Sequence, residues 1–113
     1  MDNTQKIYGL LGLAKRAGRV ISGEKMCKQS ILTGEGCFII IATDSSENTK
    51  KNLTDSCKYY DVPYTFFSTQ EELGRSIGNY FNAAVSVCDE GFAKSIMKLI
   101  GTESIDSNIN GGE

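Results

Sequence analysis

Histidine is absent from this chain of 113 residues, tryptophan is absent too, and proline occurs once. Without an imidazole there is no histidine to act as general acid or base, and no Ser-His or Cys-His nucleophile pair. Most zinc sites are excluded for the same reason. We therefore expect no catalytic residue, no metal site, no cofactor and no small-molecule substrate, and the sequence predicts that the protein is not an enzyme.

Long hydrophobic runs are also missing. No apolar stretch approaches the roughly 20 residues that cross a bilayer, and the N-terminus lacks the apolar segment of a secretory signal. Four cysteines are scattered without a Cys-x-x-Cys pair, namely Cys27, Cys37, Cys57 and Cys88. We therefore expect a soluble, cytoplasmic protein with no membrane partner, whose thiols are reduced and buried.

Positive charge, scarce over most of the chain, is concentrated near the N-terminus. The chain has a net charge of −2, yet residues 1–28 hold six lysines and arginines against Asp2 and Glu24, a net charge of +4. This basic stretch leads into Ser22-Gly23, which is typical of a helix start. Unpaired N–H groups and the helix dipole favour anions there, so the pattern indicates a nucleic-acid backbone as the ligand.

Apolar spacing predicts helices that alternate with short strands. A stripe at Ile7, Leu10, Leu11 and Ala14 indicates a helix ended by Gly18. The first half of the chain is then expected to contain an extended piece at 19–21, a Ser22-capped helix to Thr33 and a buried strand at 37–42. A helix with Leu53, Cys57 and Tyr60 inward follows, and then a strand at 64–67. The last elements are a short helix opened by a capping box at 68–71, a strand at 83–88, and a helix capped by Asp89 with Phe92, Ile96 and Leu99.

This alternation indicates an α/β fold, a single three-layer α/β/α sandwich around a small sheet that is largely parallel or mixed. Residues 1–100 form one domain of sufficient length for its own core. Residues 101–113 are rich in Gly, Ser, Asn and acids. They are expected to be a disordered tail.

Five ordered segments resemble the kink-turn-binding ribosomal protein superfamily, the L7Ae/L30e group, and within it the small bacterial branch of YlxQ-type proteins. They are 10–18, 22–24, 42–49, 62–64 and 73–78. The resemblance implies the same sandwich fold and RNA binding through a Gly-x-Asn-Glu-x-x-Lys pattern. In this chain Gly23 keeps the glycine, while Lys25, Met26 and Gln29 replace Asn, Glu and Lys. A second implied contact is the loop before the last strand, at Asn79-Tyr80-Phe81-Asn82.

A kink-turn, the RNA that the resemblance implies, exposes tandem sheared G·A pairs, whose guanine edges offer N7 and O6 acceptors and amino donors. The side chains at the start of the second helix fit these groups chemically. Lys25 can donate to the acceptors, Glu24 can accept from guanine, and Gly23 lets the backbone approach closely. The same Ser22-Gly23-Glu24 segment is also explained as a helix start with an acid in its first turn. We expect both explanations to hold.

The other basic residues have two explanations each. Lys15, Arg16 and Arg19 are placed to contact phosphates, although Lys15 and Arg16 also stabilise a helix C-terminus. Arg19 lies beyond the helix and is expected to extend the patch toward Gly23. Lys28 either joins the rim of this surface or is simply solvated.

Aromatic residues near the second loop suggest base stacking. Tyr80 or Phe81 can stack on an extruded base, and alternation predicts that only one of the two is exposed. The other aromatic residues are expected in the core or at its rim: Tyr59, Tyr60, Tyr64, Phe66 and Phe67. The acidic turn at 44–49 resembles a ligand-binding turn, but it lacks a glycine-rich cradle and is interpreted as capping.

The leading hypothesis is a non-enzymatic, ribosome-associated protein that recognises a kink-turn-like or internally looped RNA. Its surface would comprise Lys15, Arg16, Arg19, Gly23, Glu24, Lys25, Lys28, Gln29, Asn79, Tyr80 and Phe81. The alternative is a protein–protein interaction module on the same fold with a degenerate RNA surface, and a small enzyme built on the Asp44 turn is remote.

Overall fold

A computed structural model describes residues 2–103, which form five helices and four strands. In chain order the elements are α1 (Asn3–Arg16), β1 (Val20–Ser22), α2 (Glu24–Thr33), β2 (Phe38–Ile41), α3 (Glu47–Tyr60), β3 (Tyr64–Phe66), α4 (Gln70–Ser76), β4 (Ala84–Val87) and α5 (Glu90–Glu103). Helix α5 extends three residues into the segment that the sequence assigned to a tail. The rest of that segment, 104–113, lies outside the described residues.

The four strands form one mixed sheet in the order β1-β4-β2-β3. Strand β4 is antiparallel to both of its neighbours, with Ile39 opposite Ser86 and Ile21 opposite Ser86 on the other side, while β2 and β3 are parallel. All four residues of β2 and of β4 are buried. A continuous apolar strand at 37–42, expected to be covered on both faces, is thereby confirmed as an inner strand.

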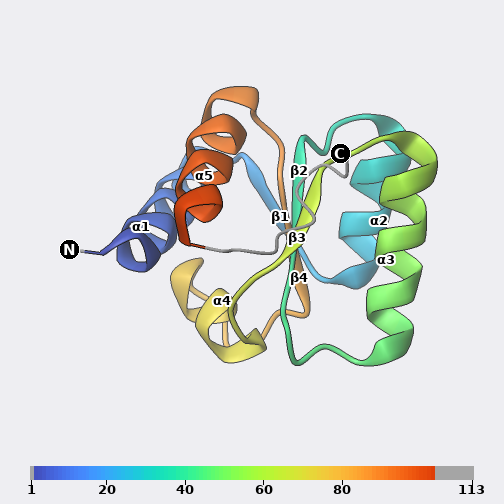
Figure 1. The fold of residues 1–113 in the computed structure, drawn as a ribbon, viewed down its shortest axis with the longest axis horizontal. Helices are drawn as coiled ribbons and strands as arrows, with labels where there is room; N and C mark the ends of the chain where they lie inside the picture. The colour runs from blue at the N-terminus through green and yellow to red at the C-terminus, as the bar shows by residue number, and fades with distance from the viewer. Residues whose placement is uncertain (1, 104–113) are drawn as a thin grey trace.

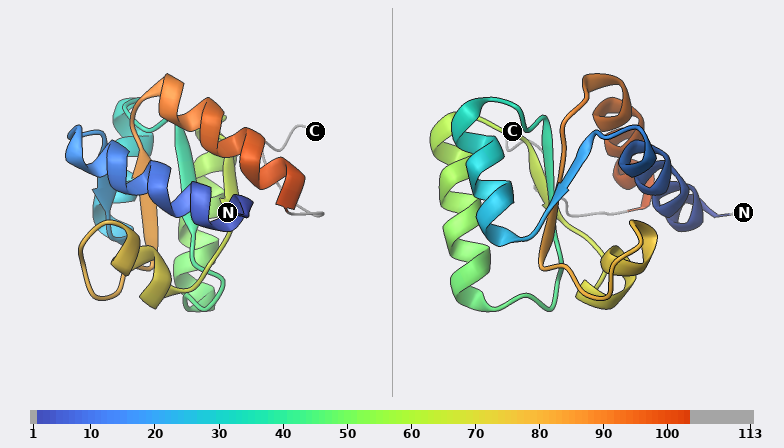
Figure 2. Two further views of the ribbon diagram at one scale, coloured as in Figure 1. Left: turned by 90° about the vertical axis from the view of Figure 1, so that its left-hand side faces the viewer. Right: turned by 180° about the vertical axis from the view of Figure 1, so that it is seen from behind.

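Helices cover both faces of the sheet, which confirms the three-layer α/β/α sandwich. Figure 1 shows α1, α4 and α5 on one side of the strands and α2 with α3 on the other, and Figure 2 shows the same layers from two further sides. Successive residues of β2 alternate between two cores: Phe38 and Ile40 pack with α1 and α5, and Ile39 and Ile41 pack with α2 and α3. This alternation follows from the two-residue period of a strand.

Two helix caps differ from the sequence prediction. The N-cap of α2 is Gly23, with a φ of 94°, and not Ser22, because Ser22 is the last residue of β1 and pairs with Val85. The N-cap of α4 is Thr69, which accepts a hydrogen bond from the Glu72 N–H. The predicted capping box was one residue early.

The end of α3 also differs from its prediction. Leu53 and Cys57 are buried as expected, but Tyr60 is 45% exposed and Tyr59 is 81% exposed. Tyr60 is the last residue of the helix, and the apolar position that follows the turn is taken by Val62, which packs against the core. The inward prediction for Tyr60 was therefore wrong.

All four cysteines are free thiols. Cys27 and Cys57 are fully buried, as predicted, while Cys37 and Cys88 are only partly buried. Burial raises the pKa of the Cys57 thiol to about 12 and raises the pKa of Cys27 further still. Within residues 2–103, none of the helices has the length and apolar character to cross a membrane.

Candidate nucleic-acid interface

The start of α2 and the loop before β4 meet at one end of the sheet. The Gly23 N–H donates a hydrogen bond of 3.0 Å to the Ala84 carbonyl, and the Ala42 N–H donates one of 2.8 Å to the Ala83 carbonyl. Ala83 and Ala84 directly follow the 79–82 loop. The structure thus places the start of α2 at the end of the sheet where the 79–82 loop leads into β4, although the two segments are more than fifty residues apart in the sequence. The shared binding surface stays a prediction.

Helix α2 begins without a side-chain cap. Its first helical hydrogen bond runs from the Cys27 N–H to the Gly23 carbonyl, at 2.9 Å. The N–H groups of the first turn therefore have no helical acceptor, and together with the helix dipole they favour an anion. Lys25 in this turn is exposed. The first turn of α2 accordingly has the chemistry of a phosphate or base-edge site.

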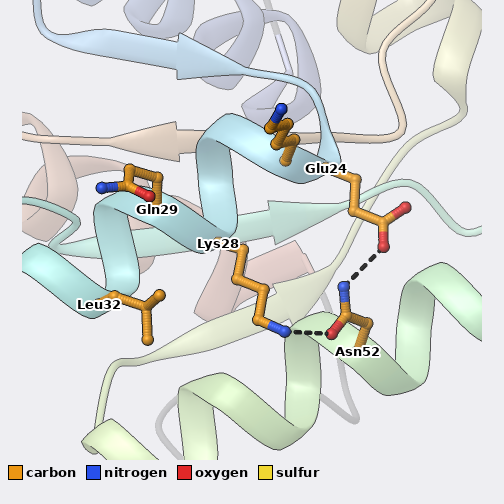
Figure 3. Close-up of a pocket in the computed structure, with 6 residues that line it drawn as sticks. Glu24, Lys28, Gln29, Leu32 and Asn52 are labelled. Atoms are coloured by element: carbon orange, nitrogen blue, oxygen red, sulfur yellow. Dashed lines mark hydrogen bonds between the residues drawn. The ribbon is translucent and has the colours of Figure 1, made fainter.

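Glu24 and Lys28 are held by α3 in a polar network that Figure 3 shows. The Glu24 carboxylate accepts one hydrogen bond from the Thr49 hydroxyl at 2.8 Å and another from the Asn52 amide at 2.7 Å. Lys28 Nζ donates to Asn52 Oδ1 at 2.8 Å. Hydrogen bonds from Asn52 and then Thr49 lower the pKa of Glu24. Each oxygen of this carboxylate thus accepts one hydrogen bond from α3 and keeps further acceptor capacity, so the contact of Glu24 with guanine stays a prediction.

A hollow of about 440 Å³ lies beside this network between α2 and α3. Its walls come from Glu24, Lys25, Lys28, Gln29, Leu32 and Asn52. Four of these six residues were predicted site residues. Asn52 was missed, because no pattern within the sequence links a polar residue in the middle of α3 to the first turn of α2.

The 79–82 loop presents two aromatic side chains to solvent. Tyr80 is 88% exposed and Phe81 is 66% exposed, so the prediction that only one of them is exposed was wrong. Alternation applies to strands, and these residues precede β4. Asn82 is the buried residue of the loop, and its N–H donates to the Gln70 carbonyl at 3.0 Å.

This loop is fixed against α4. The Asn79 N–H donates to the Gly74 carbonyl at 2.7 Å. A second hollow, of about 370 Å³, is lined by Glu71, Arg75, Asn79, Tyr80 and Phe81. Arg75 was not a predicted site residue, and its guanidinium pairs with Glu71 at 2.9 Å and with Glu72 at 3.4 Å.

The remaining predicted cations lie near the junction of α1 and β1, where the Arg19 N–H donates to the Ala14 carbonyl at 2.8 Å. Lys15 and Arg16 are exposed in the last turn of α1, and a Cβ on Gly12 would lie 3.2 Å from the Ser76 carbonyl and 3.8 Å from Arg16 Nη1. Arg16 therefore lies beside the end of α4.

Arg19 lies at the far end of β1 from Gly23. Its carbonyl accepts from the Cys88 N–H at 2.8 Å, whereas Gly23 pairs with Ala84 at the other end of β4. With a rise of about 3.3 Å per residue, the Cα atoms of Arg19 and Gly23 are about 13 Å apart. Arg19 is thus separate from the surface formed by α2 and the loop.

The acidic turn after β2 serves as a cap, as predicted. Asp44 Oδ1 accepts from the Gln70 N–H at 2.9 Å, and the Ser46 hydroxyl accepts from the Thr49 N–H at 3.1 Å. These bonds stabilise the starts of α4 and α3. Both helices are thereby tied to the end of the sheet where Gly23 lies.

Comparison with known proteins shows the family of this chain and its relatives. Residues 5–97 match the Ribosomal protein L7Ae/L30e/S12e/Gadd45 family, and the chain belongs to this family. The RNA-binding protein YlxQ of Bacillus subtilis is 41% identical over 82% of this chain and 93% of the relative. YlxQ of Enterococcus faecium is 38% identical over 87% of this chain and 94% of the relative.

More distant relatives and solved structures are also similar to this chain in sequence or fold. The large ribosomal subunit protein eL8 of Thermoplasma volcanium is 30% identical over 88% of this chain and 83% of the relative. A Bacillus halodurans protein of unknown function has a similar structure, with a TM-score of 0.82, 33% identity and coverage of 85% of this chain and 97% of that one. A 15.5 kD RNA binding protein from Giardia lamblia shares the fold, with a TM-score of 0.73, 17% identity and coverage of 88% and 86%.

Proposed function

We propose that this protein binds structured RNA and that its work is non-enzymatic. The observation that carries the proposal is the uncapped first turn of α2, which begins at Gly23 and is hydrogen-bonded to Ala84, two residues after the exposed aromatic loop at 79–82. Support comes from the family and from two relatives of similar length that are named as RNA-binding proteins. The RNA in this proposal is a kink-turn or a similar internal loop.

The start of α2 would read the RNA at its sheared G·A pairs. Gly23 has no side chain, so an RNA groove can approach the backbone closely. Lys25 is exposed and donates to guanine N7 and O6. Lys28 and Gln29 follow along the same helix, where they reach the flanking phosphates or base edges. Glu24 supports this turn through α3, since its carboxylate is already bonded there.

The loop would bind the part of the RNA that is unpaired. Tyr80 and Phe81 offer two exposed rings on which a base can stack, and Asn79 offers an amide beside them. Lys15 and Arg16, at the end of α1, would contact the backbone of the same RNA. Arg19 would add a weaker, longer-range attraction from the other end of β1.

Cellular context forms part of the same proposal. Relatives of this chain include ribosomal proteins such as eL8 and eL30, so we propose that the RNA is ribosomal and that the protein acts in the cytoplasm. The chain has a net charge of −2, and its attraction to RNA must therefore come from the local cations at the interface. Such binding weakens as salt rises, because phosphate contacts release counterions.

A gel-shift titration tests the proposal. The purified protein is titrated against a kink-turn RNA and against a straight duplex of equal length, each at two salt concentrations. We expect the kink-turn RNA to bind more tightly at both concentrations, and both affinities to fall at the higher salt. Equal affinity for the two RNAs would reject kink-turn recognition, and no binding to either would reject the function.

A further inference from the structure

Asn52 occupies a central position between two opposite charges on α2. Its amide nitrogen donates to Glu24 and its amide oxygen accepts from Lys28. Figure 3 shows the three side chains in this order, with Asn52 reaching from α3 toward both partners. Each charged group is therefore hydrogen-bonded to the Asn52 amide, and the two do not form a direct ion pair with each other.

The sequence spacing makes this arrangement informative. Glu24 and Lys28 are four residues apart on one helix, with the acid nearer the N-terminus. That is the favourable order for a direct ion pair on a helix surface. The ion pairs found among residues 2–103 do not include this one. The Thr49 hydroxyl holds the second carboxylate oxygen of Glu24 on α3 as well.

We propose that Asn52 is a positioning residue that keeps Lys28 available to an RNA phosphate by preventing its direct pairing with Glu24. An amide neutralises neither partner, so the Lys28 ammonium keeps its full charge and two further N–H donors. Direct pairing with Glu24 would cancel much of that charge at the interface. This inference rests on the RNA-binding function proposed above.

The first variant is Asn52→Ala, which removes both hydrogen bonds and lets Lys28 turn to Glu24. We expect RNA affinity to fall at least about tenfold, the size of effect for one lost hydrogen bond to a charged group. The slope of log affinity against log salt should become shallower by about 0.9, because one phosphate contact is lost. Asn48→Ala on the same helix is the matched control, since Asn48 is exposed, and it should leave both quantities unchanged.

Rescue by a second substitution separates positioning from direct contact. In Glu24→Gln/Asn52→Ala the carboxylate is gone, so Lys28 has no acid to pair with, and we expect most of the lost affinity and the salt slope to return. Failure of this rescue, with equal thermal stability of the two variants, would show that Asn52 touches the RNA itself and would overturn the inference.

A measurement without RNA tests the inference independently of the proposed function. Side-chain NMR of the free Asn52→Ala protein should show the Lys28 ammonium in contact with the Glu24 carboxylate, a contact missing in the parent protein. An unchanged Lys28 environment would overturn the inference even if RNA affinity fell. A parent protein that binds no RNA would instead reject the proposed function, and with it the role of Lys28.

Discussion

Gly74 of α4 lies directly against the backbone of Tyr80. A Cβ placed on Gly74 would be 2.6 Å from both the carbonyl carbon and the carbonyl oxygen of Tyr80, and 2.8 Å from the Phe81 nitrogen. Real Cβ atoms do not approach backbone this closely, so the aromatic loop can occupy its place only because residue 74 has no side chain. The loop is thus positioned by packing as well as by its hydrogen bond to the Gly74 carbonyl.

Gly74→Ala should therefore displace the aromatic loop. We expect the free energy of unfolding to fall by about 1–3 kcal/mol, the usual cost of overpacking. RNA affinity should fall about tenfold, because the loss of one stacked base costs about that much. Urea denaturation measures the first quantity and gel-shift titration the second.

Gly9→Ala is the control for this substitution. Gly9 is an exposed residue of α1, and a Cβ added to it would have no heavy atom of another residue within 4 Å beyond its own helix backbone and chain neighbours. Alanine there should raise stability by up to about 1 kcal/mol through helix propensity and should leave RNA affinity unchanged. If Gly74→Ala bound RNA as well as Gly9→Ala does, the loop would have no part in binding.

Charge reversal at Lys25 and at Arg19 should have unequal effects. Lys25 is in the first turn of α2, whereas the Cα atom of Arg19 is about 13 Å from that of Gly23 in an extended strand. Screening with a Debye length of about 8 Å at physiological salt weakens the attraction of the more distant cation to RNA bound at Gly23. We expect Lys25→Glu to weaken RNA binding at least tenfold and Arg19→Glu to weaken it less than threefold at about 0.15 M salt. Equal losses would place the RNA along β1 and not across the start of α2.

Local sequence patterns were sufficient for most of the fold. The apolar run at 37–42 predicted an inner strand, and β2 is indeed buried on both faces. Gly34 predicted the end of α2, and this glycine adopts the left-handed conformation that ends the helix. These features depend on neighbours within a few residues. The same holds for Asp89, which caps α5 by accepting from the Phe92 N–H.

Features that depend on distant pairing were not predictable in this way. Ser22 was expected to cap α2, but its strand pairing with Val85 carries β1 one residue further and leaves Gly23 as the cap. The Glu24–Asn52 bond joins residues 28 positions apart. Arg19 was expected near Gly23 because they are close in sequence, yet an extended strand separates them. Sequence proximity is therefore a poor guide to proximity at this interface.

The two aromatic rings of the loop should bind an unpaired base. Substitution of either Tyr80 or Phe81 by alanine should weaken binding by about 1–3 kcal/mol for an RNA with an extruded base, and much less for one without it. A 2-aminopurine at the extruded position reports stacking by fluorescence quenching. Tyr59→Ala is the control, because Tyr59 is similarly exposed, at 81%, but lies at the end of α3. A loss of RNA affinity of the same size for Tyr59→Ala would argue against base stacking on the 79–82 loop.

Burial of Cys57 should make the protein less stable at high pH. The pKa of this thiol is raised by burial from the ordinary 9.0 to about 12. The unfolded chain therefore releases the Cys57 proton near pH 9, while the folded protein keeps it until about pH 12. Between these values unfolding releases a proton, so the free energy of unfolding falls by up to about 1.4 kcal/mol per pH unit.

Below about pH 9 the contribution of Cys57 is fully present. Urea denaturation from about pH 8 to about pH 10.5 under reducing conditions, compared with Cys57→Ala, isolates the contribution of this thiol from that of the rest of the protein. We expect the stability difference between the two proteins to shrink above about pH 9. Parallel curves would show that the thiol ionises as freely in the folded protein as in the unfolded chain.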